Sequence, residues 1–417
     1  MPTPLSLLAA APHRTLFLPG AVQTVLAVAF WLAALLAQAG LLPLPEPRLP
    51  AAALHLWVMP YGLFPFFVFG FLFTAVPNWL ETAPPAKAAY VLVAVFLASG
   101  VAIAYVAAFW PVLALPAWGL QTAGWFAALW ALGRLLTAPR RTAAPPASTL
   151  TVLPALDRRH ARVAWLACAL GALGNLLFAL WLANDTGPAL RWAQALGIWG
   201  FLTPLFLAVC HRMLPWFTSR IVGGYAPYRP TWALGTLVGL AWLHAILEGL
   251  GLPQWTWVAD LPLAAVTAWL AWRWHHPHVW RVRLLAMLHL ALPWAALAFT
   301  LYAIDSLMSW SGAGSGLGLA PLHALGIGFF GGMLLAMAAR VSLGHSGRKL
   351  EADRLTWGLF WLVQVAALAR ILPELLAVAQ PLPWQILSAT LWLAAFLPWA
   401  WRHAPFYWRP RVDGKPG

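Results

Sequence analysis

Twelve long apolar stretches dominate this sequence and leave few folds open to it. They lie at approximately 21–42, 54–80, 88–110, 112–137, 160–183, 189–215, 231–251, 254–273, 280–304, 317–341, 355–378 and 381–403. A helix of about 20 apolar residues crosses the hydrocarbon core of a bilayer. These stretches are too long and too rich in leucine to be strands of a membrane barrel. The sequence therefore predicts an all-α, polytopic membrane helix bundle with about 12 transmembrane helices.

The charged residues support this class and indicate an orientation. Only 9% of the residues are charged, and 25 Lys and Arg stand against 11 Asp and Glu. If the N-terminus is cytoplasmic and the helices alternate, all basic residues except Arg48, Arg191 and Arg370 fall on the cytoplasmic side. This distribution follows the positive-inside rule, so we expect both termini in the cytoplasm (N-in/C-in). The rule, with attraction to anionic lipid, explains the basic charge without a nucleic-acid partner.

The connections divide the chain without adding a soluble domain. The longest, 138–159, is rich in Pro, Ala, Ser and Thr and predicts a flexible cytoplasmic linker. It separates membrane helices 1–4 (residues 1–137) from membrane helices 5–12 (residues 160–403), and residues 404–417 form a cytoplasmic tail. The first stretch lacks a small-residue cleavage site, so we expect a retained helix. No Cys-x-x-Cys-His motif is present, so any haem is bound without thioether links.

Four of the histidines within the apolar stretches are the best candidates for a functional role. An imidazole at membrane depth is costly and is by default a candidate functional group. Neutral imidazole is also a good ligand for iron and copper. The set therefore predicts redox metal chemistry inside the membrane, with these candidate ligands: His55, His244, His289 and His323.

Two of these histidines are followed in the sequence by residues that leave space or free a backbone group near them. His289 precedes Pro293, which frees a backbone carbonyl, so a core histidine bonded to that carbonyl is the alternative to a ligand. His323 is followed by four glycines, which admit either a flat cofactor or a neighbouring helix. The glycines are Gly326, Gly328, Gly331 and Gly332.

The other two histidines are more ambiguous. His244 and Glu248 lie four residues apart and share a helix face. The carboxylate either orients a metal-bound imidazole or closes a hydrogen-bonded pair without metal. Asp260 and Asp305, near helix ends, are interpreted as solvated. His55 opens its helix and by itself predicts a surface residue.

The remaining histidines lie near expected cytoplasmic ends. His211 and His345 adjoin Arg212 and Arg348, which favours a solvated basic rim, and they are weaker metal candidates. His275, His276 and His278 cluster in a loop beside several arginines, which also favours solvation. His13, His160 and His403 are interpreted as helix-end residues.

Several motifs carry a family resemblance. The most specific is Leu322-His-Ala-Leu-Gly-Ile-Gly-Phe-Phe-Gly-Gly-Met-Leu-Leu-Ala-Met-Ala-Ala-Arg-Val-Ser-Leu-Gly-His-Ser-Gly-Arg348. Phe71-Leu-Phe-Thr-Ala-Val-Pro-Asn-Trp79, Leu214-Pro-Trp-Phe-Thr218 and the Leu-His-Leu around His289 add to it. With these motifs, nearly the whole chain resembles the NnrS family. The resemblance implies a multi-pass protein of the bacterial inner (cytoplasmic) membrane that binds haem and copper and eases nitric oxide stress in denitrifying and pathogenic bacteria.

The resemblance also implies roles for the candidate residues. His289 and His323 become the expected axial ligands of a haem b. Copper would use His55, His244 and one of the other two histidines, with Glu248 orienting an imidazole. The sequence departs from the family where His-Ala-His-Glu-Met is typical, because His55-Leu-Trp-Val-Met59 stands there. Trp57 and Val58 thus replace a histidine and an acid, which weakens the expectation of copper more than that of haem.

Three functions remain open at this point. The first is a haem-binding protein that binds or processes nitric oxide, as an enzyme or otherwise. The second is a transporter with a midplane site of His244, Glu248 and His289, although the two halves of the sequence show no convincing repeat. The third is a non-catalytic subunit or assembly partner of a respiratory complex. A respiratory-chain partner or a homo-oligomer fits the first reading as well.

Overall fold

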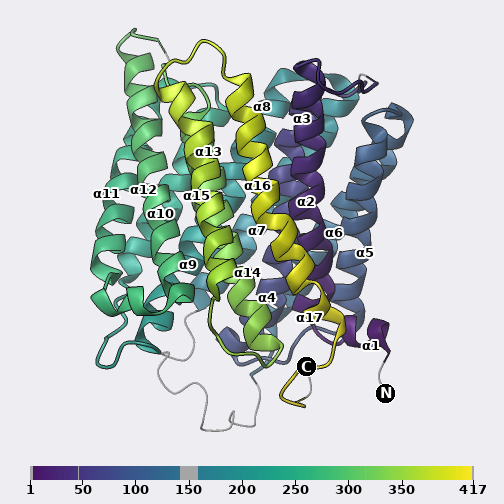
Figure 1. Ribbon diagram of the computed structural model, residues 1–417, viewed down its shortest axis with the longest axis vertical. Helices are drawn as coiled ribbons and strands as arrows, with labels where there is room; N and C mark the ends of the chain where they lie inside the picture. The colour runs from purple at the N-terminus through teal and green to yellow at the C-terminus, as the bar shows by residue number, and fades with distance from the viewer. Residues whose placement is uncertain (1–2, 46, 141–157, 315, 416–417) are drawn as a thin grey trace.

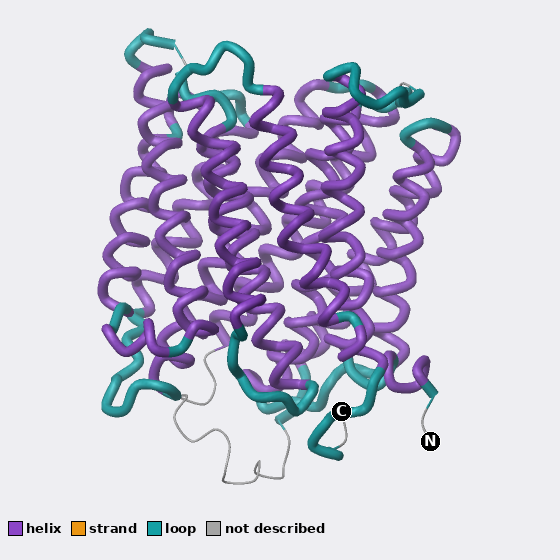
Figure 2. Tube along the Cα trace, viewed as in Figure 1, coloured by secondary structure: helices purple, strands orange, loops and turns teal. Residues whose placement is uncertain are grey.

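The computed structural model describes residues 3–45, 47–140, 158–314 and 316–415. Within these residues the chain is helical apart from its connections, and strands are absent (Figure 2). The long helices run side by side, and both termini lie at the same end of the bundle (Figure 1). We call this the terminal end and the opposite one the far end.

The described residues form twelve long helical segments. In chain order they are α2 (Pro12–Gln38), α3–η1–α4 (Ala51–Trp57, Val58–Leu63, Phe64–Leu80), α5 (Lys87–Ala107), η2–α6 (Pro111–Leu113, Ala114–Thr137), α7 (Arg158–Asn184), α8–η3–α9 (Gly187–Ala195, Leu196–Leu202, Thr203–Ser219), α10 (Thr231–Gly249), η4–α11 (Pro253–Trp255, Trp257–Trp274), α12 (Arg283–Trp310), α13–η6–α14 (Ala320–His323, Ala324–Gly331, Gly332–His345), α15 (Arg354–Leu375) and α16 (Leu382–His403). The short α1 (Pro4–Leu8), η5 (Pro277–Arg281) and α17 (Pro405–Trp408) lie between or beyond them.

This architecture confirms the predicted class of membrane helix bundle. Ten of the described helices are long and apolar enough to cross a membrane. The two other long segments, α11 and α16, are rich in tryptophan, and α11 also contains Asp260 and Arg273, so their hydropathy is lower. The count of twelve crossings and the orientation of the termini stay predictions. Most of the expected linker at 138–159 lies outside the described residues.

The first long helix begins earlier than expected, at Pro12 instead of residue 21. Its opening turn contains His13 and Arg14, which lower the local hydropathy and hide the helix in a hydropathy profile. Both side chains are nevertheless buried. The Arg14 guanidinium donates to the backbone carbonyls of Tyr407 and Arg409, at 3.4 and 3.0 Å, so the C-terminal segment covers this helix start.

The twelve segments form three units of four with the same order of elements. The units are α2 to α6, α7 to α11 and α12 to α16, and the second segment of each is interrupted by a π-helical turn: η1, η3 or η6. The last helix of each unit packs against the first helix of the next, as α6 on α7, α11 on α12 and α16 on α2, which closes a ring. Comparing two halves of the sequence misses this repeat because it is threefold.

The three interrupted segments meet at the centre of the ring. Phe64 of α4, Phe206 of α9 and Phe330 of η6 contact one another, with ring centroids 5.7, 5.9 and 4.9 Å apart. The π-helical turns of the second and third units begin in identical tetrapeptides, Ala195-Leu-Gly-Ile198 and Ala324-Leu-Gly-Ile327. Because π-helical turns occur frequently at functional sites, the space beside these turns is the first place to look for one.

Candidate functional site

A cavity of about 620 Å³ lies beside the π-helical turns, on the far-end side of the three phenylalanines. Its size is within the range of small-molecule and cofactor sites. Phe64 and Phe330 line it, so the aromatic cluster forms its floor. Two groups of polar side chains also line it. The histidine side consists of His55, His323 and Arg370, and the acidic side of His244, Glu248, Tyr302 and Asp305.

His55 is part of the cavity wall, although its sequence position indicates a surface residue. It belongs to α3, and its ring stacks on Trp31 of α2 with centroids 4.5 Å apart and planes 16° apart. Its Nδ1 is buried and has no hydrogen-bond partner. The imidazole is therefore held by packing while a ring nitrogen is left unused.

His323 is held by a hydrogen bond from its own helix. Its Nδ1 lies 2.9 Å from the carbonyl oxygen of Leu319. Because a carbonyl only accepts, Nδ1 carries the proton and Nε2 keeps its lone pair. This arrangement is typical of a metal-binding histidine, in which a backbone acceptor fixes the tautomer and the ring direction. His323 also lies close enough to His55 and Arg370 to interact with them electrostatically.

The glycines after His323 have two different roles: some allow close helix packing, and one leaves space beside the cavity. A Cβ on Gly328 would lie 2.4 Å from Trp294, and one on Gly331 would lie 2.7 Å from Trp392. These two glycines, with Gly332, allow neighbouring helices to approach closely. Gly326 is different, because it lines the cavity and has open space where a Cβ would stand. Gly326 therefore leaves space beside His323 for a flat cofactor.

Arg370 brings a positive charge to the histidine side. It lies on α15, and its guanidinium pairs with Glu374 one turn later. Its side chain is only 9% exposed, so the charge is largely removed from solvent. A guanidinium in such a setting suits a carboxylate, which it can bind through two parallel hydrogen bonds.

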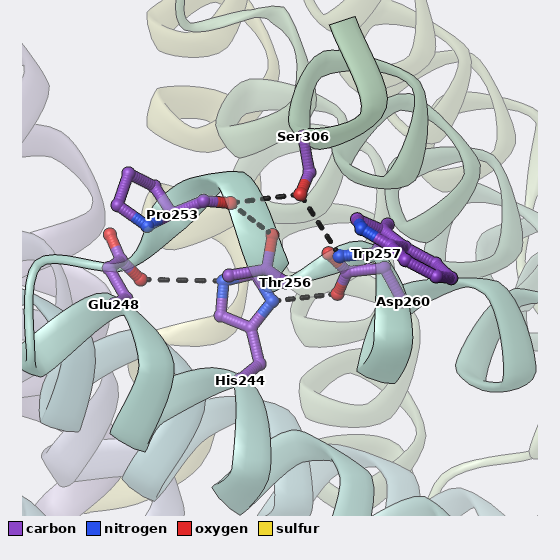
Figure 3. A network of polar contacts seen from close by, with 7 residues as sticks. All are labelled: His244, Glu248, Pro253, Thr256, Trp257, Asp260 and Ser306. Atoms are coloured by element: carbon purple, nitrogen blue, oxygen red, sulfur yellow. Dashed lines mark hydrogen bonds and ion pairs between the residues drawn. The ribbon is translucent and has the colours of Figure 1, made fainter. Parts of the chain in front are cut away.

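On the acidic side, His244 lies between two carboxylates (Figure 3). Its Nδ1 is 2.7 Å from Asp260 Oδ1, and its Nε2 is 3.4 Å from Glu248 Oε2. His244 and Asp260 are buried, and the ring of Trp199 stacks on the imidazole with centroids 3.5 Å apart. Both nitrogens thus face acids, so neither is free for a metal.

The start of α11 holds Asp260 in place. Thr256 and Ser306 hydroxyls both donate to the carbonyl of Pro253, at 3.1 and 2.9 Å, and Trp257 N–H donates to Ser306 at 3.1 Å (Figure 3). The interpretation of Asp260 as a solvated end residue is therefore wrong, since it is fully buried. It is Asp260 that orients His244 through Nδ1, the role that the sequence assigned to Glu248. An acid in the first turn of an apolar stretch was the available signal.

His289 lies elsewhere, towards the terminal end. Its Nε2 is 3.0 Å from the Thr218 hydroxyl, which donates to Leu214 O and therefore accepts from His289. The partner is thus Thr218 and not the carbonyl freed by Pro293. Residues 289 and 302 are thirteen apart on α12, and at 1.5 Å per residue about 20 Å separate His289 from Tyr302 in the cavity wall. His323 lines the cavity and His289 does not, so the structure does not bring these two expected axial ligands together.

His211 and His345 also lie at the terminal end. His211 is buried, only 1% exposed, and its nitrogens are 3.0 Å from His160 Nε2 and 3.1 Å from Pro230 O. The expected solvated rim is therefore wrong for His211. His345 is partly buried and lies against His13, with ring centroids 4.1 Å apart. Neither residue lines the cavity.

Trp57 and Val58, which replace the histidine and the acid of the family motif, are fully buried and do not line the cavity. Trp57 packs against Trp118 and Phe178 and donates from Nε1 to Asn175 at 2.8 Å. The change at this position therefore alters helix packing and leaves the cavity wall unchanged.

The described residues contain no group of three or more His, Cys, Asp or Glu side chains arranged to hold one metal ion. In particular, the expected copper set of His55, His244 and a third histidine is not brought together. Two imidazoles, His55 and His323, are what the cavity offers to a metal.

A family model described as NnrS protein matches residues 7–411, nearly the whole chain. No curated protein matches the sequence.

Proposed function

Because the chain belongs to the NnrS family, we propose that it is a haem-binding protein of the bacterial inner membrane that binds or processes nitric oxide. The observation that carries this proposal is the cavity that His55, His323 and Arg370 line together. Its position among helices with the length and composition of membrane spans fits a cofactor bound within the membrane.

The residues present fit a haem. His323 offers Nε2 with its lone pair, and its Nδ1 is held by Leu319. His55 adds a second imidazole, whose buried Nδ1 has no protein partner. Arg370 is suited to the carboxylate edge of a haem, and Gly326 leaves flat access. Axial ligand, pocket polarity and access are the features by which a protein tunes haem.

Each residue then has a distinct task. A bound haem supplies an iron that takes a diatomic ligand. His323 would hold the iron, and His55 would face the pocket as a second ligand or as a neighbour of the bound gas. Arg370 and Glu374 fix the orientation of the carboxylate edge. The phenylalanine floor closes the site towards the terminal end, and the apolar wall favours an uncharged ligand such as nitric oxide.

Copper does not fit in the same way. It would need several ligands, and the described residues supply no such group. The transporter reading is not supported either, because His289 lies about 20 Å along α12 from the acidic side. The three units also run in parallel, since each begins and returns at the terminal end (Figure 1). An inverted repeat, common in transporters, is not their arrangement.

The proposal is tested by adding nitric oxide to the purified protein under anaerobic conditions. We expect the haem absorption bands to shift in proportion to the bound gas in the oxidised or reduced protein. Loss of nitric oxide from solution, followed with an electrode in the presence of a chemical reductant, distinguishes turnover from binding. A haem spectrum that does not respond to nitric oxide in either redox state would contradict the proposal.

A further inference from the structure

His244 and its two neighbouring carboxylates, Glu248 and Asp260, form a triad that shares too few protons to be neutral. One proton lies between His244 Nδ1 and Asp260 Oδ1, which are 2.7 Å apart. A second proton lies on His244 Nε2, which faces Glu248 Oε2 at 3.4 Å without a hydrogen bond to it, because a lone pair facing a carboxylate would be repelled. With two protons for two carboxylates and one imidazole, the group carries a net charge of −1.

The surroundings do not neutralise this charge. Asp260 Oδ2 is buried and has no hydrogen-bond partner. The other ionisable groups around the triad are Tyr302 and Asp305 of α12 and Arg191 of α8. Arg191 directs its Nε to the carbonyl of Gly249, not to a carboxylate. An uncompensated charge at this depth is costly.

Glu248 is placed to exchange a proton. It lies in the last turn of α10 at the far end, and its side chain is 33% exposed while that of His244 is only 2% exposed. It also lines the cavity, together with His244. Glu248 therefore reaches both the far-end surface and the pocket, whereas Asp260 is enclosed.

We propose that Glu248 is a proton-exchange residue for the pocket and that His244 and Asp260 are its positioning residues. Glu248 takes a proton from hydronium at the far end, leaving water, and releases it to a base in the pocket. His244 holds the carboxylate through Nε2, and Asp260 fixes His244 through Nδ1. The identity of the group that receives the proton rests on the proposed function. The proton site itself does not require haem.

Infrared difference spectroscopy of the purified full-length protein at two pH values tests the proton site. A protonated carboxyl group has a carbonyl band of its own that shifts in deuterated water. We expect such a band to appear on acidification, to be lost in Glu248→Gln, and to shift in Asp260→Asn. The control is Asp185→Asn, because Asp185 lies at the same end of the bundle, is exposed and does not line the cavity. The control should keep the band.

A wild-type protein without the band, or a band that survives in Glu248→Gln, would overturn the proton site. Circular dichroism and gel filtration of each variant show that it is folded, and Glu248→Asp, which keeps the carboxyl group, should restore the band. This measurement needs no haem, so it stands even if the protein binds none.

A redox titration tests the connection to the pocket. When one electron enters a pocket haem, Glu248 itself should take up one proton, so the midpoint potential should fall as pH rises. In Glu248→Gln this pH dependence should be lost, and in Asp185→Asn it should remain. An unchanged pH dependence in Glu248→Gln would show that Glu248 does not serve the pocket. Absence of haem in every preparation would instead contradict the proposed function.

Discussion

His55 and Trp57 show that a residue's role depends on the direction in which its side chain leaves the helix. They lie two positions apart in one motif, yet His55 lines the cavity and Trp57 packs between α6 and α7. A sequence motif gives the identity of such residues but not the face of the helix that meets the cavity. Trp57 weakened the expectation of a metal site in the sequence, but this residue does not line the cavity in which such a site would lie.

This geometry makes a prediction for Trp57→His, which restores the histidine typical of the family. The imidazole would lie beside Asn175 and Trp118, so we expect no additional metal in the protein. Replacing a fully buried tryptophan with a smaller side chain should also cost about 3 kcal/mol of stability. Metal analysis and thermal unfolding in detergent check both effects. A stoichiometric gain of copper would contradict this placement of residue 57.

Asp260 shows that contacts between residues on different helices are also not given by the sequence. It lies sixteen positions from His244, on the next helix, and their contact depends on how α10 and α11 pack. The neighbour that the sequence does indicate, Glu248, shares a helix with His244 and is found on its other nitrogen. Contacts within one helix follow from spacing, whereas contacts between helices require the packing itself.

At the scale of elements, the sequence predicted the long helices but not their interruptions. Hydrophobic length determines where a helix can cross a bilayer, and the predicted stretches match the observed segments closely apart from the start of α2. A π-helical turn leaves no comparable signal, because it inserts a single residue and is stabilised by neighbouring helices. The glycines and proline at these turns were visible, but their packing partners were not.

The glycines of η6 provide a matched pair of substitutions. Gly328→Ala would place a methyl group 2.4 Å from Trp294 and should cost about 1–3 kcal/mol through overpacking. Gly326→Ala meets open space, so it should keep its stability and instead narrow the cavity beside His323. Thermal unfolding and haem content measure the two effects. Equal stability of the two variants would contradict the packing described for η6.

The C-terminal segment gives a pH-dependent prediction outside the membrane spans. Arg411 donates to Asp413 at 2.9 and 2.6 Å, holding the pKa of that carboxyl well below its usual range. Arg411 also donates to His345 O, and Val412 N–H to Ser346 O, each at 3.1 Å. A depressed pKa stabilises docking above the ordinary pKa of an aspartate, and this contribution is lost only as pH falls through the lowered value.

Docking of this segment should therefore be constant from weakly acidic to neutral pH. Asp413→Asn removes the ion pair at every pH, so trypsin should cleave after Arg411 several-fold faster than in the wild type at pH 7. Limited proteolysis with mass spectrometry measures the rate. Equal rates in the two proteins would show that the ion pair does not hold the segment.

At the scale of the whole molecule, composition was sufficient for the class of fold and insufficient for the site. Long apolar segments with few charges must satisfy their backbone hydrogen bonds internally in lipid, and for segments of this length a helix bundle is the structure that does so. The cavity arises where three interrupted segments meet, and its position follows from the closure of the ring by α16 on α2. Of the four candidate histidines, His55, His244 and His323 line the cavity, whereas His289 lies towards the terminal end.

The orientation of the bundle in the membrane is also testable at this scale. Reporter fusions at positions 150 and 312 should report opposite sides, the first cytoplasmic, because basic residues concentrate at the terminal end. The cavity would then lie in the outer half of the membrane. Reporters on the same side would contradict the odd number of crossings that the predicted layout places between these two positions.

The measurement that tests the central claim most directly is the absorption spectrum of the purified protein and of two single variants. The account predicts a Soret band from a haem that acidic organic solvent extracts. His323→Ala should lose at least about half of this haem, while His289→Ala, at a residue that does not line the cavity and lies about 20 Å along α12 from Tyr302, should keep it. No Soret band after expression with added haem, or a band lost in His289→Ala and retained in His323→Ala, would contradict the account.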